Sequence, residues 1–330
     1  MLKTGDMGMT ESNFDTFAEE CLINKTDNYQ EVLSAIDKLE VRVYPDKFAE
    51  ILNHFFVISN DYNVVNYILK KMNKHKSRIY VPVLVDALVL EDNYKNKFNT
   101  QEIQTQIRVN VAKLLANLKD TSAVNALLYC LNNKQENYKL RLSCAEALGK
   151  IGDKFAVLPL SEILKDDNEN SVYLKESAAF ALGMIGDTKA VEPLVGILET
   201  KQGIIDKFTF LKERAIEALS KINFNSDRVF NALKNSLNDE SVQVRVNAVE
   251  ALSNIEDDRV ADLLYSSLSD KSEEVVKNVI IALFNLRGEK ILYEILNDYS
   301  LPEHTMKIIR EVIKEVEEAA DEEDDNSENI

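Results

Sequence analysis

Apolar residues recur along the middle of the chain with the period of an amphipathic helix. In the segment that begins at residue 140, they are Leu140, Cys144, Ala147, Leu148 and Ile151. Offsets of 4, 7, 8 and 11 residues from the first of them place these side chains on one face of a helix. A shorter apolar run follows over residues 156–164, and another over residues 190–198. The pattern predicts helices in antiparallel pairs.

The first helix of the pair is repeated. Fourteen-residue windows that align without gaps begin at Ile107, Leu140, Leu174, Leu211, Val244 and Val275. Their starts are 33, 34, 37, 33 and 31 residues apart. One core layer recurs as Leu115, Leu148, Leu182, Leu219, Leu252 and Leu283. Each pair of helices leaves an apolar face that the next pair can cover, so this period predicts a solenoid.

Small and helix-ending residues also recur at matched positions. Alanine recurs at Ala145, Ala179, Ala215 and Ala248. These alanines would let neighbouring first helices approach closely. Gly152 and Gly186 can adopt the left-handed conformation that ends a helix. Pro159 and Pro193 lie near the start of the second helix, where a missing N–H costs little.

The strings AEALGKIGDKFAVLPL and AAFALGMIGDTKAVEPL resemble HEAT repeats, specifically the phycobilisome-lyase HEAT-like subtype. The resemblance covers residues Ile107 to Asp270, continues more loosely to Tyr299 and is weak before Ile107. It implies an all-α fold, an α-solenoid or superhelix of HEAT-like antiparallel helix pairs. The repeat pattern departs at Phe224, Val276 and Gly288. We therefore expect less regular stacking in the fourth and sixth repeats.

In that family a basic residue and an acidic residue at fixed positions form a structural ladder along the stack. The resemblance carries the basic positions over to Arg108, Arg141, Lys175, Lys212 and Arg245. It carries the acidic positions over to Asp120, Asp153, Asp187 and Asp257. Because each position occurs once per repeat, we expect these columns to be structural rather than a binding site.

The remaining segments complete the predicted organisation. The sequence predicts a flexible lead-in over residues 1–13 and a divergent helical region over residues 14–106. The helices expected in that region span residues 29–39, 46–58, 64–72 and 81–90. Residues 107–319 hold the HEAT-like repeats and end in a capping helix over 303–319. Ten acids and a single base, Lys314, occupy residues 311–330. We expect residues 320–330 to be a disordered acidic tail, either solubilising or in contact with a partner.

Charge and composition narrow the classes of function. The 56 acids and 39 bases give a net charge of −17, which disfavours binding to nucleic acid and to anionic membranes. No stretch of about 18 apolar residues could span a membrane, and the first residues lack the apolar core of a signal peptide. Cys21, Cys130 and Cys144 follow no disulfide pattern. These features predict a cytoplasmic protein.

Few residues could carry catalysis or hold a metal. The histidines are His54, His75 and His304, and no CxxC or HExxH spacing occurs. We therefore expect no catalytic residue, no metal and no cofactor. Cys130 and Cys144 fall on or beside apolar stripes, which favours core packing over a reactive or ligand-attaching thiol.

The outward positions of the second helices are the predicted interaction surface, and we take these helices to line the concave side. Their outward polar residues are Asn125, Tyr129, Glu162, Glu192, Glu199, Asp262 and Tyr265. Several carboxylates with two tyrosines suit a basic or mixed-charge segment of another protein; a merely solvated face is the alternative. An insertion over residues 199–210 adds Ile204, Ile205, Phe208 and Phe210. These side chains either fold back onto the core or contact a partner.

These observations favour a non-catalytic HEAT-repeat scaffold, adaptor, or assembly or chaperone factor. It would bind another protein through the concave face and the 199–210 insertion. The resemblance implies one enzymatic alternative, a bilin lyase or isomerase subunit in which Cys130 or Cys144, Tyr129 and the concave carboxylates hold a tetrapyrrole. A nucleic-acid-binding HEAT protein would need a basic concave stripe, which the sequence lacks. No feature predicts the oligomeric state.

Overall fold

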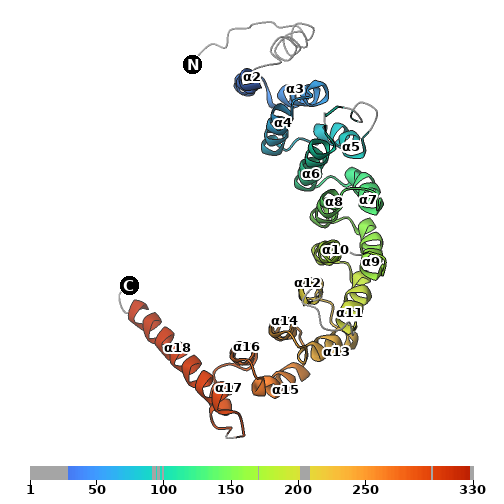
Figure 1. Cartoon of the computed structure of the whole chain (residues 1–330). Helices are drawn as coiled ribbons and strands as arrows, with labels where there is room; N and C mark the ends of the chain where they lie inside the picture. Colours follow the sequence, from blue (N-terminus) through green and yellow to red (C-terminus); the bar gives the residue numbers. More distant parts are fainter. Residues whose placement is uncertain are drawn as a thin grey trace. The chain divides into compact units, whose positions relative to one another are not determined.

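The structure is a computed structural model that describes residues 29–90, 94, 97–98, 100–169, 171–200, 209–298 and 300–327 (Figure 1). Every regular element in these residues is a helix. The chain forms two compact units, residues 1–159 and 160–330. The predicted all-α solenoid of antiparallel helix pairs is confirmed, and each unit is an array of such pairs.

The N-terminal unit holds two rows of helices. Its helices are α2 (Tyr29–Arg42), α3 (Pro45–Ile58), α4 (Tyr62–His75), α5 (Val81–Val89), α6 (Gln101–Leu118), α7 (Val124–Asn132) and α8 (Tyr138–Ile151). Helices α2, α4, α6 and α8 pack one on the next, and α5 packs on α7. Helix α9 (Val157–Lys165) crosses the boundary between the units. The four helices predicted before residue 91 are present as α2 to α5.

The C-terminal unit repeats this arrangement. Its helices are α10 (Val172–Ile185), α11 (Val191–Glu199), α12 (Thr209–Ile222), α13 (Asp227–Ser236), α14 (Val242–Ser253), α15 (Arg259–Ser266), α16 (Glu273–Arg287), α17 (Lys290–Leu296) and α18 (Glu303–Ser327). Helices α10, α12, α14 and α16 pack in sequence, and α18 packs on α16 and α17. Ile309 and Val312 of α18 are buried in that contact, so α18 covers the last apolar face of the row, as predicted for a cap.

The repeated apolar positions form the core. All six leucines of the predicted layer, from Leu115 to Leu283, are buried. The small residues at the matched positions are buried as well. A Cβ atom added at Gly183 would lie 2.7 Å from Cα of Ala218. The backbones of α10 and α12 are therefore in direct contact at this point.

Left-handed residues end the first helices as predicted. Gly152 and Gly186 follow α8 and α10 with φ values of 78° and 72°. Lys119 and Asn223 hold the same position after α6 and α12, with φ values of 53° and 48°. Asparagine tolerates this region better than most residues. Helix α12 therefore ends in the usual way although Phe224 replaces the acid of the repeat pattern.

The assignment of the concave side to the second helices is wrong for the C-terminal unit. Figure 1 shows α10, α12, α14 and α16 on the inner side of the bend of this unit, and α11, α13 and α15 on the outer side. The small residues explain the difference, because the distance between packed helices depends on the side chains at the contact. The row with alanine and glycine at its contacts is the shorter one, and the shorter row lies inside the bend.

The predicted tail is also shorter than expected. Helix α18 continues to Ser327, so the prediction of disorder from residue 320 is wrong as far as that residue. Extending an existing helix needs no new nucleation, and Glu and Ala are good helix formers. The predicted lead-in over residues 1–13 lies outside the described residues.

Candidate protein-binding surface

The basic column binds carboxylates that the sequence analysis did not assign to it. The buried Arg108 side chain donates to both carboxylate oxygens of Glu136, at 2.6 and 2.8 Å, and its Nε donates to the carbonyl of Leu88 at 2.6 Å. Lys212 pairs with Asp239 at 2.5 Å. Arg245 donates to both oxygens of Asp270, at 2.8 and 2.9 Å, and to a backbone carbonyl.

Arg108, Lys212 and Arg245 therefore bind carboxylates that lie outside the acidic column. The carboxylates that they bind lie at the end of the next second helix, where the basic side chain closes the turn between repeats. Arg141 donates to the carbonyl of Leu131, near the end of the preceding helix α7, at 2.8 Å. Lys175 lines a cavity of about 70 Å³ beside Lys212.

The acidic column caps the short turns that precede the second helices. The Asp153 carboxylate accepts from the backbone N–H of Phe155 at 2.9 Å. The other three acids, Asp120, Asp187 and Asp257, make the same bond to the residue two positions ahead. The fixed position of the acid follows from this capping geometry.

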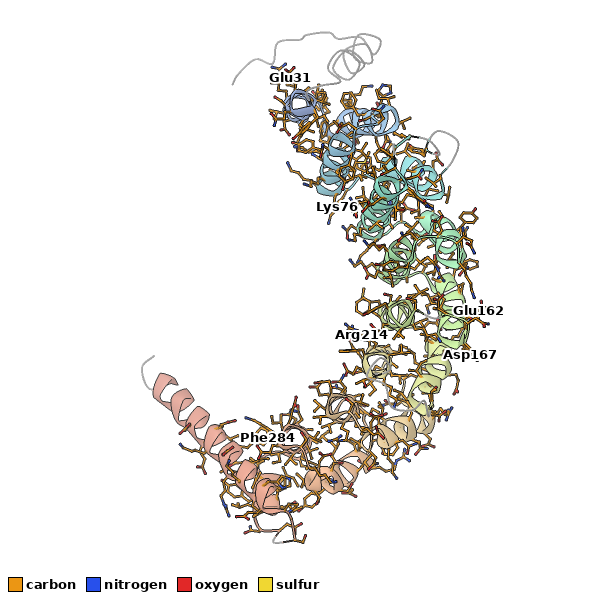
Figure 2. The ribbon with its side chains drawn as sticks, viewed as in Figure 1. Glu31, Lys76, Glu162, Asp167, Arg214 and Phe284 are labelled. Atoms are coloured by element: carbon orange, nitrogen blue, oxygen red, sulfur yellow. The ribbon has the colours of Figure 1, made fainter. Side chains whose placement is uncertain are left out.

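The candidate residues lie on the second helices, and in the C-terminal unit this places them on the outer row rather than on the predicted concave side. Tyr129 on α7 is 62% exposed. Glu162 on α9 is exposed, and Figure 2 shows it on the outer side of that helix. Asp262 on α15 is exposed and lies 3.7 Å from Arg287. These side chains do not converge on one site, because they come from separate repeats.

Other outer-row candidates are engaged within the chain. Arg228 of α13 forms ion pairs with Glu192 and Glu199 of α11. The Tyr265 hydroxyl donates to Asp298 at 3.0 Å, and burial together with that carboxylate raises the pKa of Tyr265 to about 12. These residues stabilise contacts between repeats. Of the insertion, Ile204, Ile205 and Phe208 lie outside the described residues, whereas Phe210 is at the start of α12.

The inner row of the C-terminal unit carries an apolar stripe that the sequence analysis missed. On α10 it consists of Tyr173, Phe180 and Met184, which share one helical face with Glu176. Phe210 of α12 occupies the same repeat position as Tyr173. The exposed fractions are 70% for Tyr173, 62% for Phe210 and 42% for Met184.

Charged side chains of α12 border the stripe. Nζ of Lys221 lies 4.9 Å from the ring centroid of Phe180, and the Arg214 guanidinium lies 5.8 Å from it. Figure 2 shows Arg214 on the inner side of α12. Glu217 binds both cations, at 2.6 and 2.8 Å. Glu217 therefore engages both cations but balances only one of the two positive charges.

Two further carboxylates complete this surface. Burial raises the pKa of Glu176, and burial together with the nearby Glu176 charge raises the pKa of Glu213, although Arg214 opposes both shifts. We name this surface the inner α10–α12 face. It comprises Tyr173, Glu176, Phe180, Met184, Phe210, Glu213, Arg214, Glu217 and Lys221.

A second exposed apolar group lies on the outer row of the N-terminal unit. Phe155 is 66% exposed and Leu158 is 68% exposed. The turn that contains Phe155 packs on α7, the helix that carries Tyr129. The signal for Phe155 was available in the sequence, because the matched positions are Ser122 and Lys189.

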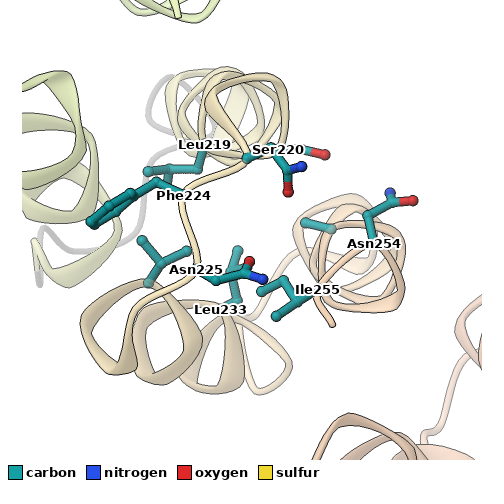
Figure 3. Close-up of a pocket in the computed structure, with 10 residues that line it drawn as sticks. Leu219, Ser220, Phe224, Asn225, Leu233, Asn254 and Ile255 are labelled. Atoms are coloured by element: carbon teal, nitrogen blue, oxygen red, sulfur yellow. The ribbon is translucent and has the colours of Figure 1, made fainter. Parts of the chain in front are cut away.

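No group of three or more His, Cys, Asp or Glu side chains in the described part of the chain could hold a metal ion. Cys130 and Cys144 are both buried thiols. The cavity in Figure 3, between α12, α13 and α14, is about 10 Å³, room for no more than a water molecule.

The amine of Lys97 also serves the fold. Burial lowers the pKa of Lys97 to about 8. Its Nζ donates to the carbonyls of Phe56 and Val57, at the end of α3, and lies 4.9 Å from the ring centroid of Tyr94. These contacts hold the amine against the end of α3.

Comparison with protein families decides the class. The family described as HEAT repeats matches residues 101–174 and 204–285, and the PBS lyase HEAT-like repeat matches residues 174–200. The chain is a HEAT-repeat protein. Comparison of this HEAT-repeat protein with curated protein sequences finds no match. Among its described residues, no helix is both long and apolar enough to cross a membrane.

Solved structures share the fold of the HEAT-repeat protein. Kap121p aligns over 89% of this chain and 37% of its own, with a TM-score of 0.54 and 13% sequence identity. The CpcE–CpcF complex of phycocyanin lyase from Nostoc sp. PCC7120 aligns over 69% of this chain and 92% of its own, with a TM-score of 0.43 and 18% identity. At 13% identity, the likeness to Kap121p extends to the fold alone.

Proposed function

We propose that this HEAT-repeat protein is a non-catalytic scaffold or adaptor that binds another protein through the inner α10–α12 face. The observation that carries the proposal is the exposure of Tyr173 and Phe210 at one repeat position of two packed helices, with Met184 beside them. Exposed apolar patches rimmed by charge are typical of protein–protein interfaces. Aromatic, Met and Arg side chains are enriched there.

Other features of the chain support a cytoplasmic protein partner. Repeat arrays present extended surfaces to other proteins. The net charge of −17 disfavours nucleic acid and anionic membranes as ligands and favours a basic or mixed-charge partner segment. We further propose that Ile204, Ile205 and Phe208 of the insertion extend the surface that begins at Phe210.

The test compares the proteins captured from a native extract of the source organism by three forms of the full chain. These are the unchanged chain, a Tyr173→Ser/Phe210→Ser variant and a Tyr129→Ser/Leu158→Ser control from the outer row. All four side chains are more than half exposed, so the Tm should hold in both variants.

We expect the inner-face variant to bind the captured partner about tenfold more weakly or worse, and the control to bind it normally. Equal capture by all three forms would refute the proposal for this face.

A bilin lyase or isomerase subunit is the second candidate function. The match of residues 174–200 to the PBS lyase HEAT-like repeat favours it. Both Cys130 and Cys144 are fully buried, so a tetrapyrrole would bind without attachment to either thiol in the folded chain. Mixing the protein with a free bilin tests this candidate, because binding changes the visible absorption spectrum. An unchanged spectrum would count against it.

A further inference from the structure

Two carboxylates on the inner α10–α12 face have no counter-charge in contact with them. Glu176 and Glu213 form no hydrogen bond or ion pair with the other described residues. Glu217, the third acid of the face, is different, because it binds Arg214 and Lys221. The unpaired charges therefore sit on the side of the face next to Tyr173 and Phe210.

The position of these carboxylates makes their charges costly. Both side chains are half-buried, at matched positions of the packed helices α10 and α12. Each charge also raises the energy of the other, because like charges repel more strongly where water is partly excluded. One cation placed beside both carboxylates would relieve both costs. Arg214 acts on both carboxylates without touching either of them, so it relieves these costs only in part.

The apolar residues around the pair suit the stem of a long cationic side chain. Tyr173 lies three positions before Glu176, and Phe210 three positions before Glu213, so each carboxylate has an exposed aromatic ring on its own helical face. Lysine and arginine lay their methylene groups along apolar surface while the charged head reaches a polar group.

Building on the proposed function, we propose that Glu176 and Glu213 together bind one lysine or arginine side chain of the partner, whose neighbouring apolar residues pack on Tyr173 and Phe210. The inner α10–α12 face would thus select a segment with a cationic residue among apolar ones. An acidic or phosphorylated segment would be rejected, because its charges would meet two unpaired carboxylates.

The experiment first maps the partner segment. A photoreactive phenylalanine analogue replaces Tyr173 in the full chain. A second chain carries the analogue in place of Tyr44, which is also exposed to solvent but lies at the start of α3. After irradiation in a native extract, mass spectrometry identifies the partner segment joined to each position. We expect a segment joined only at the Tyr173 position, with a lysine or arginine beside apolar residues.

The second step measures the affinity of that segment as a synthetic peptide. We expect Glu176→Gln/Glu213→Gln to weaken its binding about tenfold or more, since each lost contact is a charge-assisted one. The matched control, Glu146→Gln/Glu250→Gln, removes two exposed carboxylates from α8 and α14 and should leave the affinity unchanged. Replacing the peptide's cationic residue by norleucine should reproduce the loss.

The possible failures are distinguishable. If no segment is joined at the Tyr173 position above the Tyr44 background, the proposed function of this face is wrong. If a segment is joined but has no lysine or arginine, or if Glu176→Gln/Glu213→Gln binds it as tightly as the unchanged chain, the carboxylate inference is wrong and the proposed function stands.

Discussion

At the scale of single residues, Gly183 is a position where the structure has no room for an added side-chain atom. Its missing Cβ would lie 2.7 Å from the Ala218 backbone and 2.9 Å from the Ala218 side chain. We predict that Gly183→Ala lowers the free energy of unfolding by about 1 to 3 kcal/mol, because α10 and α12 must move apart. Gly196→Ala is the matched control, since a Cβ at Gly196 of α11 meets nothing within 4 Å.

The control should be stabilised by up to about 1 kcal/mol, which is the helix preference of alanine over glycine. Urea unfolding followed by circular dichroism measures both variants. Equal stability of Gly183→Ala and the unchanged chain would show that the two helices are not in backbone contact.

The ion pair of Arg108 with Glu136 gives a second prediction at this scale. Arg108→Met leaves the Glu136 carboxylate without its counter-charge and should lower the free energy of unfolding by about 3 to 5 kcal/mol. In the double variant Arg108→Met/Glu136→Met much of that loss should be recovered, because no unpaired charge is left. The exposed Arg228 pair is the comparison, and Arg228→Met should leave the Tm nearly unchanged. If Arg108→Met kept a Tm as high as that of Arg228→Met, the result would contradict this account.

The sequence was informative about these basic residues but not about their partners. The repeat positions of Arg108, Lys212 and Arg245 are visible in the aligned windows. Their carboxylate partners precede the next window by four or five residues, in turns of varying length. An alignment of helices alone does not reveal such a pair, because the bond forms only when the turn folds back onto the helix.

At the scale of elements, the first pair of helices is held by a charged network. Glu40 of α2 binds Lys71, Lys74 and His75 of α4. The bonds to Lys71 and Lys74 lower the pKa of Glu40 to about 2, from an ordinary value of 4.5. A carboxyl group whose pKa is lowered by folding stabilises the folded protein at pH values above its pKa in the unfolded chain. This contribution is lost as the pH falls from 4.5 towards 2.

We therefore predict that Glu40→Gln has a lower Tm than the unchanged chain at neutral pH, and that the difference shrinks as the pH falls from about 4.5 to about 2. Thermal unfolding followed by circular dichroism at a series of pH values measures it. A difference that stays constant over this range would show that the Glu40 charge does not hold α2 to α4.

The two rows of helices show which features of the fold the apolar pattern predicts and which it does not. Apolar periodicity predicted the helices. Gly152 and Gly186 predicted where two of them end, because glycine readily adopts the left-handed conformation. The periodicity did not show which row lies inside the bend, because that depends on the spacing of neighbouring helices. The alanine positions contained this information, since the row with small contact residues is the shorter one. Assigning the concave side to the second helices leaves out Tyr173 and Phe180, which lie on a first helix.

At the scale of the whole molecule, helix pairs stack on their neighbours along the chain. Each repeat contacts its neighbours, so a substitution on one exposed face should not spread to distant repeats. The inner α10–α12 face joins exposed aromatic residues to two unpaired carboxylates, and both come from adjacent repeats. The sequence predicted the solenoid, and it assigned the second helices to the concave side, whereas in the C-terminal unit they form the outer row.

The most direct test of the central claim is hydroxyl-radical footprinting of the protein with and without its captured partner. Radicals oxidise exposed Tyr, Phe and Met side chains, so the measurement reports which of them the partner covers. We predict that oxidation of Tyr173, Met184 and Phe210 falls several-fold in the complex, while oxidation of Tyr129 and Phe155 is unchanged. Protection of Tyr129 and Phe155, with Tyr173 and Phe210 oxidised as in the free protein, would contradict the account.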